Sequence, residues 1–580
     1  MNRQRRNLTD EDIRRAIEVL SDEEQLDDMD NIETTNFSDS EEDFEENGSE
    51  VEDNQSGSDT GEEEEGENWT YTGRDNTEWD VRPANEGRVR AHNIIKGKLH
   101  KVILPPGKHI DSPVDAMQLF LDKELINVIT ENTNIHGRGI EGDNWKDTDE
   151  EEIYAYIGLL INAGIYKQGI LDYNEFWDPL FGSPIFRATM SKNRFVNLQK
   201  HIRFDDISTR SARREKDKFA PMREVWNKLN INLTKYYIPG KNLTIDEQLV
   251  PFRGRVSFRQ YIPSKPDKYG MKIWWICDSE TSYPLLGIPY LGKEGLNRGQ
   301  NLGEKVVLEL CQRYERTNRN ITFDNYFTSY NLAQQLLSKG LTCIGTLRKN
   351  KGCIPPNFLP NNRREVGTSI FGFRKNITLV SYVPRKSKAV ILLSTMHHND
   401  AVSGEEKHKP IIILDYNETK GGVDTLDQLA HAYSTKRKSN RWPMTQFYNI
   451  IDIAGVAAMI CWLNIFPDYE LSKKNHRRKL FLKQLVTDLV APHIKRRSTK
   501  YLSKSKIATI NNVLKRSSAV LESEPEVPPT RVNKSRCYIC PAKISRCSKQ
   551  KCSACENTVC NEHSSKKIIC QNCKNNNGII

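Results

Sequence analysis

The sequence lacks the two features that would place a protein in the secretory pathway or in a membrane. Its first residues, MNRQRRNLTDED, contain no apolar stretch, so we expect no signal peptide. The longest apolar run, IIDIAGVAAMICWLNIF at residues 450–466, is about 17 residues long and contains Asp452. Because that length is at the short end for a membrane span, we predict a buried core helix and no membrane association.

Basic residues are absent from an acidic N-terminal segment. Between Ser21 and Gly66 there are 21 Asp and Glu residues and no Lys or Arg. The whole chain has a formal charge of +8, which leaves +29, the sum of 8 and 21, for the remainder. A basic body favours a polyanionic partner, most simply nucleic acid, although a soluble protein with an acidic tail has the same composition. Few large apolar residues accompany the acidic run, so we predict that residues 1–90 are a disordered arm, either regulatory or solubilising.

Cysteine is sparse until the C-terminal end of the chain. Of the 13 cysteines, five are scattered through apolar contexts and eight lie between Cys537 and Cys573. Since we expect no secretory signal, a reducing nuclear or cytosolic compartment follows. Clustered cysteines bind metal there more often than they form disulfides.

The C-terminal cluster has the spacing of a zinc-binding module, because four ligand pairs, each separated by two residues, suit two tetrahedral Zn²⁺ ions. We predict an interleaved, or cross-brace, arrangement, and sequential pairing is the alternative. The first ion is assigned to Cys537, Cys540, Cys560 and His563, and the second to Cys552, Cys555, Cys570 and Cys573, which leaves Cys547 unassigned.

The same C-terminal segment is basic. Between Arg531 and Lys574 there are ten Lys and Arg residues against two Glu. This charge suits DNA phosphates, but RING-like modules that bind proteins share the cysteine spacing, which does not separate the two functions.

Four aspartates stand in short apolar contexts: Asp246 in LTIDEQLVPF, Asp324 in ITFDNYF, and Asp424 with Asp427 in GGVDTLDQL. A carboxylate in a buried strand is costly unless something neutralises it. Asp424 and Asp427, three residues apart, share one face of a predicted helix. Carboxylates from two strands and a helix suit a two-Mg²⁺ phosphoryl-transfer site. Taken singly, each aspartate also fits a strand end or a helix cap.

The pattern of apolar residues predicts a mixed architecture. Residues from about 112 to 239 have helical spacing. After Asn242, short strands are followed by alternating helices and strands, which predicts an α/β layer. Short β-like runs among basic residues predict an insertion at about 351–410. The run PIIILDYN then predicts a strand and VDTLDQLAHAYS a helix, and residues from about Trp442 to Leu521 are helical and basic.

A basic segment with an aromatic residue follows the second aspartate pair. In STKRKSNRWP, the residues Lys436, Arg437, Lys438 and Arg441 precede Trp442. Basic side chains beside an aromatic ring suit an unpaired or distorted DNA strand. The alternative is a solvated helix end with Trp442 in the core.

Six segments in this order resemble those of the piggyBac transposase family: IDEQLVPFRGR, KYGMKIWW, FDNYFTS, GTLRKNK, GGVDTLDQL and KRKSNRWP. A Cys/His module follows them, as in that family. The resemblance covers about residue 112 to the C-terminal end and extends to the acidic arm only in composition.

The resemblance implies an α/β RNase H-like catalytic domain with an insertion, a flanking, mostly helical DNA-binding and dimerisation domain, and a small C-terminal zinc-binding cross-brace module. The expected boundaries are 1–90 for the disordered arm, 91–240 and 434–521 for the helical domain, 241–350 and 411–433 for the catalytic domain, 351–410 for the insertion, 522–534 for a linker and 535–580 for the zinc-binding domain.

The resemblance also implies roles for individual residues. Asp246, Asp324 and Asp424 match the catalytic set that binds two Mg²⁺ ions, and Asp427 matches a further required carboxylate. None of the four is substituted, which argues against an inactive derivative. In GTLRKNK, two basic residues match positions that contact target DNA, Arg348 and Lys351.

Members of this family cut transposon ends through hairpin intermediates and insert at TTAA. The C-terminal module is similar to one that recognises terminal repeats. We therefore expect a nuclear, homodimeric enzyme that acts on transposon end repeats and TTAA target DNA. The alternative is a domesticated DNA-binding or chromatin protein without strand transfer.

Overall fold

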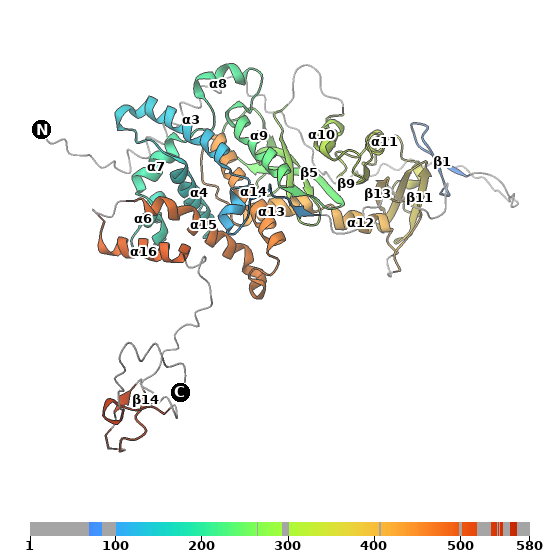
Figure 1. Cartoon of the computed structure of the whole chain (residues 1–580). Helices are drawn as coiled ribbons and strands as arrows, with labels where there is room; N and C mark the ends of the chain where they lie inside the picture. Colours follow the sequence, from blue (N-terminus) through green and yellow to red (C-terminus); the bar gives the residue numbers. More distant parts are fainter. Residues whose placement is uncertain are drawn as a thin grey trace. The chain divides into compact units, whose positions relative to one another are not determined.

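The structure of the chain is a computed structural model (Figure 1). It describes residues 69–83, 100–263, 265–292, 301–404, 408–497 and 502–518, and in the C-terminal segment 535–541, 543–544, 546–548 and 557–564. Residues up to Ser517 belong to one compact unit, and Ser518–Ile580 belong to a second.

A sheet of 11 strands runs through the first unit in the order β1-β2-β11-β12-β13-β10-β9-β5-β7-β6, and β8 pairs with β7. Its strands are β1 (Thr70–Thr72), β2 (Glu78–Asp80), β5 (Asn242–Pro251), β6 (Arg259–Tyr261), β7 (Tyr269–Asp278), β8 (Pro284–Pro289), β9 (Asn320–Phe323), β10 (Thr342–Thr346), β11 (Ser369–Arg374), β12 (Ile377–Arg385) and β13 (Lys388–Ser394). The pairs β5–β9 and β9–β10 are parallel, whereas β7 pairs antiparallel with both β5 and β8.

The parallel strands are joined by helices, as the sequence predicts for an α/β layer. Helix α10 (Leu302–Cys311) precedes β9, and α11 (Tyr330–Ser338) connects β9 to β10. Strand β7, with the sequence YGMKIWWICD, is buried at nine of its ten positions, as a central strand covered on both faces should be.

The predicted strand PIIILDYN is instead helix α12 (Ile411–Thr419), so this prediction was wrong. A short apolar run does not distinguish a strand from a covering helix. Here Pro410 precedes the first turn, and Ile412 and Ile413 pack on a sheet cluster that includes Ile344 and Leu392. The run therefore covers the sheet and does not join it.

The segment predicted as an insertion, residues 351–410, adds β11, β12 and β13 to the central sheet. Strand β13 pairs antiparallel with β10, from Ile344 opposite Ser394 to Thr346 opposite Leu392. The β-like runs are thus strands, and they extend the central sheet without forming a separate one.

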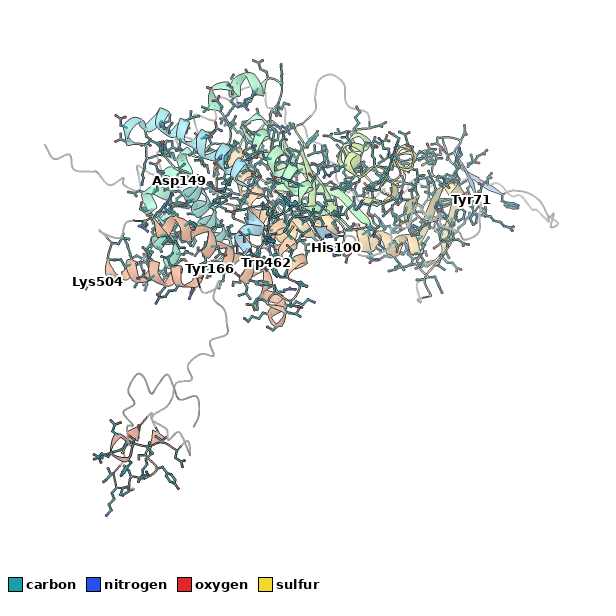
Figure 2. All side chains as sticks on the ribbon, in the orientation of Figure 1. Tyr71, His100, Asp149, Tyr166, Trp462 and Lys504 are labelled. Atoms are coloured by element: carbon teal, nitrogen blue, oxygen red, sulfur yellow. The ribbon has the colours of Figure 1, made fainter. Side chains whose placement is uncertain are left out.

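Residues 69–83 correct the prediction that the whole of 1–90 is disordered. They form the hairpin β1–β2, which pairs with β11 at Phe373 opposite Asp80. Trp79 is fully buried, and its indole N–H donates to the Cys353 carbonyl at 2.8 Å. Tyr71, labelled in Figure 2, packs edge-on against Phe358 with 5.3 Å between ring centroids. These two aromatic residues bind the hairpin to the sheet although acidic sequence precedes them.

Helices from two distant parts of the chain pack together beside the sheet (Figure 1). The N-terminal set is α2 (Pro113–Met117), α3 (Lys123–Glu141), α4 (Glu150–Ile165), α5 (Tyr173–Trp177), α6 (Pro184–Thr189), α7 (Lys192–His201), α8 (Ile207–Arg214) and α9 (Ala220–Lys235), with the short pair β3 (Lys101–Val102) and β4 (Tyr237–Ile238). The C-terminal set is α13 (Gly422–Ala432), α14 (Trp442–Ile465), α15 (Arg477–Lys495) and α16 (Lys504–Ser518). Helix α15 packs against α4 and α2, and α14 packs against α2 and α9.

Helix α14 contains the longest apolar run and is a core helix, as predicted. It is long and apolar enough to cross a membrane, but 72% of its most apolar window is buried inside the protein. Its buried side chains, from Trp442 to Trp462, pack in the same core as the sheet.

We predict that Trp79→Ala destabilises the first unit by about 3 kcal/mol or more, because truncating a buried aromatic side chain leaves a cavity and an unpaired carbonyl. The measurement is the free energy of unfolding in urea. Trp69→Ala is the matched control, since Trp69 is 76% exposed beside the same hairpin. Equal effects of the two substitutions would contradict the role of Trp79.

Candidate metal and nucleic-acid site

Asp246 and Asp324 lie side by side across the parallel pair β5–β9. The last registered pair of the two strands is Ile245 opposite Phe323. Asp246 is the next residue of β5, and Asp324 directly follows the end of β9. Both side chains are half-buried. The Oδ1 atom of Asp246 accepts the Glu247 backbone N–H at 2.7 Å, and that of Asp324 accepts the Tyr326 N–H at 3.0 Å.

Burial and neighbouring negative charge disfavour the ionisation of both carboxylates. Burial, followed by the charges of Glu247 and Asp324, raises the pKa of Asp246 well above its usual range. Burial and the charge of Glu247 raise the pKa of Asp324 to about 6, although Lys272 and Arg348 act in the opposite direction. A divalent cation would relieve this repulsion, so the donor set suits a metal.

Helix α13 docks on the face of β5 that carries Asp246. Thr244, Asp246 and Gln248 alternate along β5 and share one face. The Thr244 hydroxyl donates to the Thr419 carbonyl at 2.5 Å, at the end of α12. Gly422 allows the approach, because a Cβ there would lie 2.8 Å from Thr244 Oγ1. The contact brings Asp424 and Asp427 to the same face of the sheet as Asp246.

Asp427 is held by protein groups. Its Oδ1 accepts a hydrogen bond from Gln248 Nε2 at 2.9 Å and lies 3.2 Å from His431 Nδ1. The hydrogen bond to Asp427 raises the pKa of His431 to about 9, so the imidazole is protonated at neutral pH. Gln248 Oε1 in turn accepts the Trp275 indole N–H at 3.0 Å. Asp427 therefore fixes α13 to β5 and β7.

Asp424 is the most exposed of the four, with 59% of its side chain accessible. It lies in the first turn of α13 and forms an ion pair with Lys265, whose Nζ lies 3.6 Å from its Oδ1. Within the described part of the chain, the carboxylates of Asp246, Asp324 and Asp424 do not gather within 4.8 Å of one another. Two of the predicted ligands are adjacent, and the third is engaged by a lysine.

Sequence reasoning missed Lys265 and Gln248. Gln248 carried a signal, because it stands two residues after Asp246 and so must share its strand face. Lys265 lies in the connection between β6 and β7, and no periodic pattern ties that connection to the aspartates.

Arg348 lies at the rim of this site. Its Nε donates to Asn325 Oδ1 at 3.2 Å, its guanidinium is 5.9 Å from the Tyr326 ring, and its charge acts on Asp324. Lys351 follows in a turn, where its N–H donates to the Arg348 carbonyl at 3.1 Å. Both positions are compatible with a phosphate ligand.

The basic segment after α13 is used mainly inside the protein. Arg437 is 6% exposed, lies 4.5 Å from the Tyr173 and Phe176 rings and donates to the Gln168 carbonyl at 3.1 Å. Arg441 is 8% exposed and donates to the Ile202 carbonyl at 2.8 Å.

Trp442 is also buried, packed on the Phe219 and Phe258 rings. Arg437, Arg441 and Trp442, which the sequence predicts to contact DNA, are therefore buried and have partners inside the protein. Lys436 is half-buried and Lys438 is exposed, so these two remain available to a ligand.

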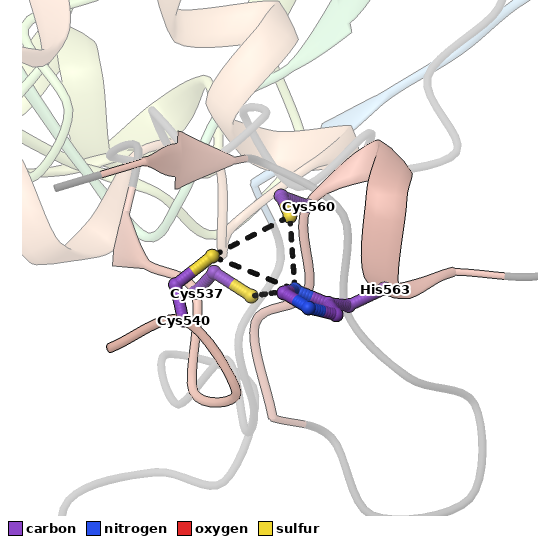
Figure 3. Close-up of side chains that lie close together, drawn as sticks. All are labelled: Cys537, Cys540, Cys560 and His563. Atoms are coloured by element: carbon purple, nitrogen blue, oxygen red, sulfur yellow. Dashed lines mark hydrogen bonds between the residues drawn. The ribbon is translucent and has the colours of Figure 1, made fainter. Parts of the chain in front are cut away.

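The second unit gathers four of the predicted zinc ligands. Strand β14 (Ser535–Arg536) pairs with β15 (Cys547–Ser548), and a short 3-10 helix spans Asn561–His563. Figure 3 shows the side chains that meet between them, which are Cys537, Cys540, Cys560 and His563. Their ligand atoms all lie within 4.8 Å of one another, and His563 Nδ1 is 3.3 Å from Cys560 Sγ.

This Cys₃His set can hold a metal such as zinc. It joins the first and third ligand pairs of the sequence, as the interleaved arrangement predicts and the sequential one does not. The residues predicted for the second ion, Cys552, Cys555, Cys570 and Cys573, lie outside the described residues. Cys547 is exposed and is not one of the four clustered ligands.

Comparisons with known proteins show what the larger part of the chain is similar to. A family model described as "Transposase IS4" matches residues 112–459. The human PiggyBac transposable element-derived protein 3 is 23% identical over 367 residues, which is 59% of this chain and 60% of that protein. The human PiggyBac transposable element-derived protein 2 is 24% identical over 368 residues, with the same coverage. The chain thus spans about 60% of the length of these curated relatives.

A solved structure is similar over a larger part of the chain. It is the cryo-EM structure of the piggyBac transposase synaptic complex with hairpin DNA. The TM-score is 0.67 and the sequence identity 36%, and the match covers 82% of this chain and 100% of the other.

We predict that Asp324→Asn stabilises the first unit by about 1–3 kcal/mol at pH 7.5 without added divalent metal. The folded-state pKa of about 6 exceeds the ordinary 3.8, so ionisation costs the folded state free energy above pH 6. The gain should fade as the pH falls through 6 towards 4. Thermal unfolding across this pH range measures it, and Asp143→Asn, an exposed carboxylate, is the control. Destabilisation at pH 7.5 would contradict the account.

We predict that Cys560→Ser lowers the bound zinc by about one ion per chain, because a tetrahedral site does not tolerate the loss of a thiolate. Metal content of the purified full chain, measured by mass spectrometry, tests this. Cys547→Ser is the matched control and should keep the zinc of the unsubstituted protein. Equal zinc loss in both variants would show that the ligand set is wrong.

Proposed function

Because this chain belongs to the piggyBac-type transposase family, described as Transposase IS4, we propose that it is a cut-and-paste DNA transposase. The observation that carries the proposal is the position of three aspartates. Asp246 and Asp324 end up adjacent through the parallel register of β5 and β9, and α13 brings Asp424 to the same face. Metal-dependent DNA strand cleavage and transfer needs carboxylates that can bind divalent cations on one face of the site.

The catalytic domain is proposed to be RNase H-like. Three antiparallel strands, β8, β7 and β5, are followed in the sheet by the parallel strands β9 and β10. The helices α10 and α11 make the crossover connections. This order, together with the 36% identical piggyBac transposase structure, supports the assignment.

Asp246, Asp324 and Asp424 would hold the two Mg²⁺ ions. When bound, these ions would activate water or a 3′-hydroxyl and stabilise the leaving oxygen. The protein would keep the half-buried carboxylates of Asp246 and Asp324 adjacent, and the hydrogen bond from Gln248 to Asp427 would hold α13 beside them. Arg348 at the rim would orient a phosphate of the bound strand.

The remaining parts of the proposal concern partners. The Cys/His unit, holding zinc, would recognise transposon end repeats, and the helical segments would serve dimerisation and DNA binding. Hairpin intermediates, insertion at TTAA and a nuclear location complete the proposal. It is supported by the likeness to a synaptic complex that contains hairpin DNA.

A second candidate function is a domesticated DNA-binding or chromatin protein without strand transfer. The human relatives, named as derived from transposable elements, favour it. The presence of all four aspartates favours the enzyme.

We predict that the full chain excises a donor element carrying its cognate ends from a plasmid, and that Asp246→Asn, Asp324→Asn and Asp424→Asn each reduce excision by about 100-fold or more. Loss of a metal ligand removes charge stabilisation in the transition state while the fold remains. The three variants should bind end DNA like the unsubstituted protein in a mobility-shift assay.

Glu131→Gln, a solvent-facing carboxylate on α3, is the control and should excise normally. Excision that persists in the aspartate variants would show that the site is misassigned. End binding without any excision by the unsubstituted protein would favour the domesticated alternative.

A further inference from the structure

Lys265 is the residue of the carboxylate site that neither the sequence pattern nor the family assignment uses. It lies in the connection between β6 and β7, and 21% of its side chain is exposed. Its Nζ lies 3.6 Å from Asp424 Oδ1 and donates to the Glu247 carbonyl at 3.3 Å. The ammonium is thus fixed to β5 and to the start of α13 at the same time.

Carboxylates from both elements surround this ammonium. Strand β5 presents Asp246 and Glu247, and α13 presents Asp424 and Asp427. Burial alone would lower the pKa of Lys265, but these four charges raise it, so the side chain is a cation at neutral pH.

Two other basic residues of the site have different partners. Lys272 on β7 lies 3.6 Å from Glu247 and stacks on the Trp274 and Tyr326 rings. Arg348 acts on Asp324 from the rim. The ion pair that the structure shows for Asp424 is the one with Lys265.

An ammonium on Asp424 and a divalent cation on the same carboxylate oppose each other's binding. A single and a double positive charge about 6 Å apart repel strongly even at the effective dielectric constant of a protein surface. This repulsion corresponds to a tenfold or larger change in the affinity for the metal. A metal that uses Asp424 therefore competes with Lys265.

We propose that Lys265 is a displaceable counter-cation of the metal site. It neutralises the carboxylates when metal is absent, holds Asp424 away from Asp246 and Asp324, and so weakens divalent-metal binding by the DNA-free protein. Lys265 is a positioning residue, because it acts through Asp424. This inference rests on the proposed metal-dependent transferase function.

The test is a titration of the zinc-loaded full chain with Mn²⁺ in the absence of DNA, with free Mn²⁺ measured by electron paramagnetic resonance. We expect Lys265→Gln to lower the dissociation constant for Mn²⁺ by about tenfold or more, and Lys265→Arg to stay near the unsubstituted value. Lys339→Gln is the control, since it removes a half-buried lysine that pairs with Glu315 at 2.6 Å. Unchanged or weaker Mn²⁺ binding by Lys265→Gln overturns the inference.

The outcomes separate this inference from the proposed function. If Asp246→Asn abolishes Mn²⁺ binding and Lys265→Gln has no effect on it, the counter-cation role of Lys265 is refuted and the proposed function stands. Absence of any Mn²⁺ binding that depends on Asp246 refutes both.

A second measurement uses the unsubstituted protein and so does not depend on the folding of a variant. Amine acylation followed by peptide mass spectrometry reports the reactivity of each lysine. Mg²⁺ should increase acylation of Lys265 several-fold and leave Lys339 unchanged. Displacement from the carboxylates lets the Lys265 ammonium lose its proton more readily, and the neutral amine is the form that is acylated. Equal or lower acylation of Lys265 with Mg²⁺ overturns the inference.

Discussion

The organisation of the first unit depends on one electrostatic constraint: two half-buried carboxylates, Asp246 and Asp324, stand side by side where β5 and β9 run parallel. Burial and the charge of Glu247 raise the pKa of both, and the charge of Asp324 adds to the shift of Asp246, so their ionised forms are unfavourable without a cation. A protein that only needed a stable sheet would have placed apolar residues there. The surrounding groups are arranged to make this cost tolerable and useful.

Three elements carry that arrangement. Helix α13 approaches β5 closely because Gly422 has no Cβ, and the Gln248–Asp427 hydrogen bond fixes its position. The β6–β7 connection supplies Lys265, and β10 leads to Arg348 at the rim. The helices from both ends of the unit hold the sheet from outside, with α14 as their buried centre. Site and scaffold are thus linked through a few polar contacts on one face of β5.

Much of this could be predicted from the sequence, for physical reasons. Asp246 and Asp324 follow apolar strand residues, and Asp424 and Asp427 have helical spacing, so their elements were correctly predicted. The α/β nature of the sheet followed from the alternation of its elements. The interleaved grouping of Cys537 and Cys540 with Cys560 and His563 followed from ligand spacing.

Other features depend on tertiary contacts and were not predictable. Residues 411–419 form a helix because the sheet surface beside them needs a cover, and Trp79 orders a hairpin that composition assigns to disorder. Arg437 and Arg441 carry the charge of a DNA-binding segment, but both donate hydrogen bonds to carbonyls inside the protein, and Arg437 also packs on aromatic rings. Lys265 reaches the aspartates from an irregular connection, where spacing carries no information about contacts.

The central claim is that Asp246, Asp324 and Asp424 form one divalent-metal site. Its most direct test is an experimental structure of the full chain with DNA and Mn²⁺, in which anomalous scattering locates the metal. The account predicts Mn²⁺ bound by these three carboxylates, with Lys265 displaced from Asp424. Mn²⁺ bound elsewhere, or an intact Lys265–Asp424 ion pair beside bound metal, would contradict it.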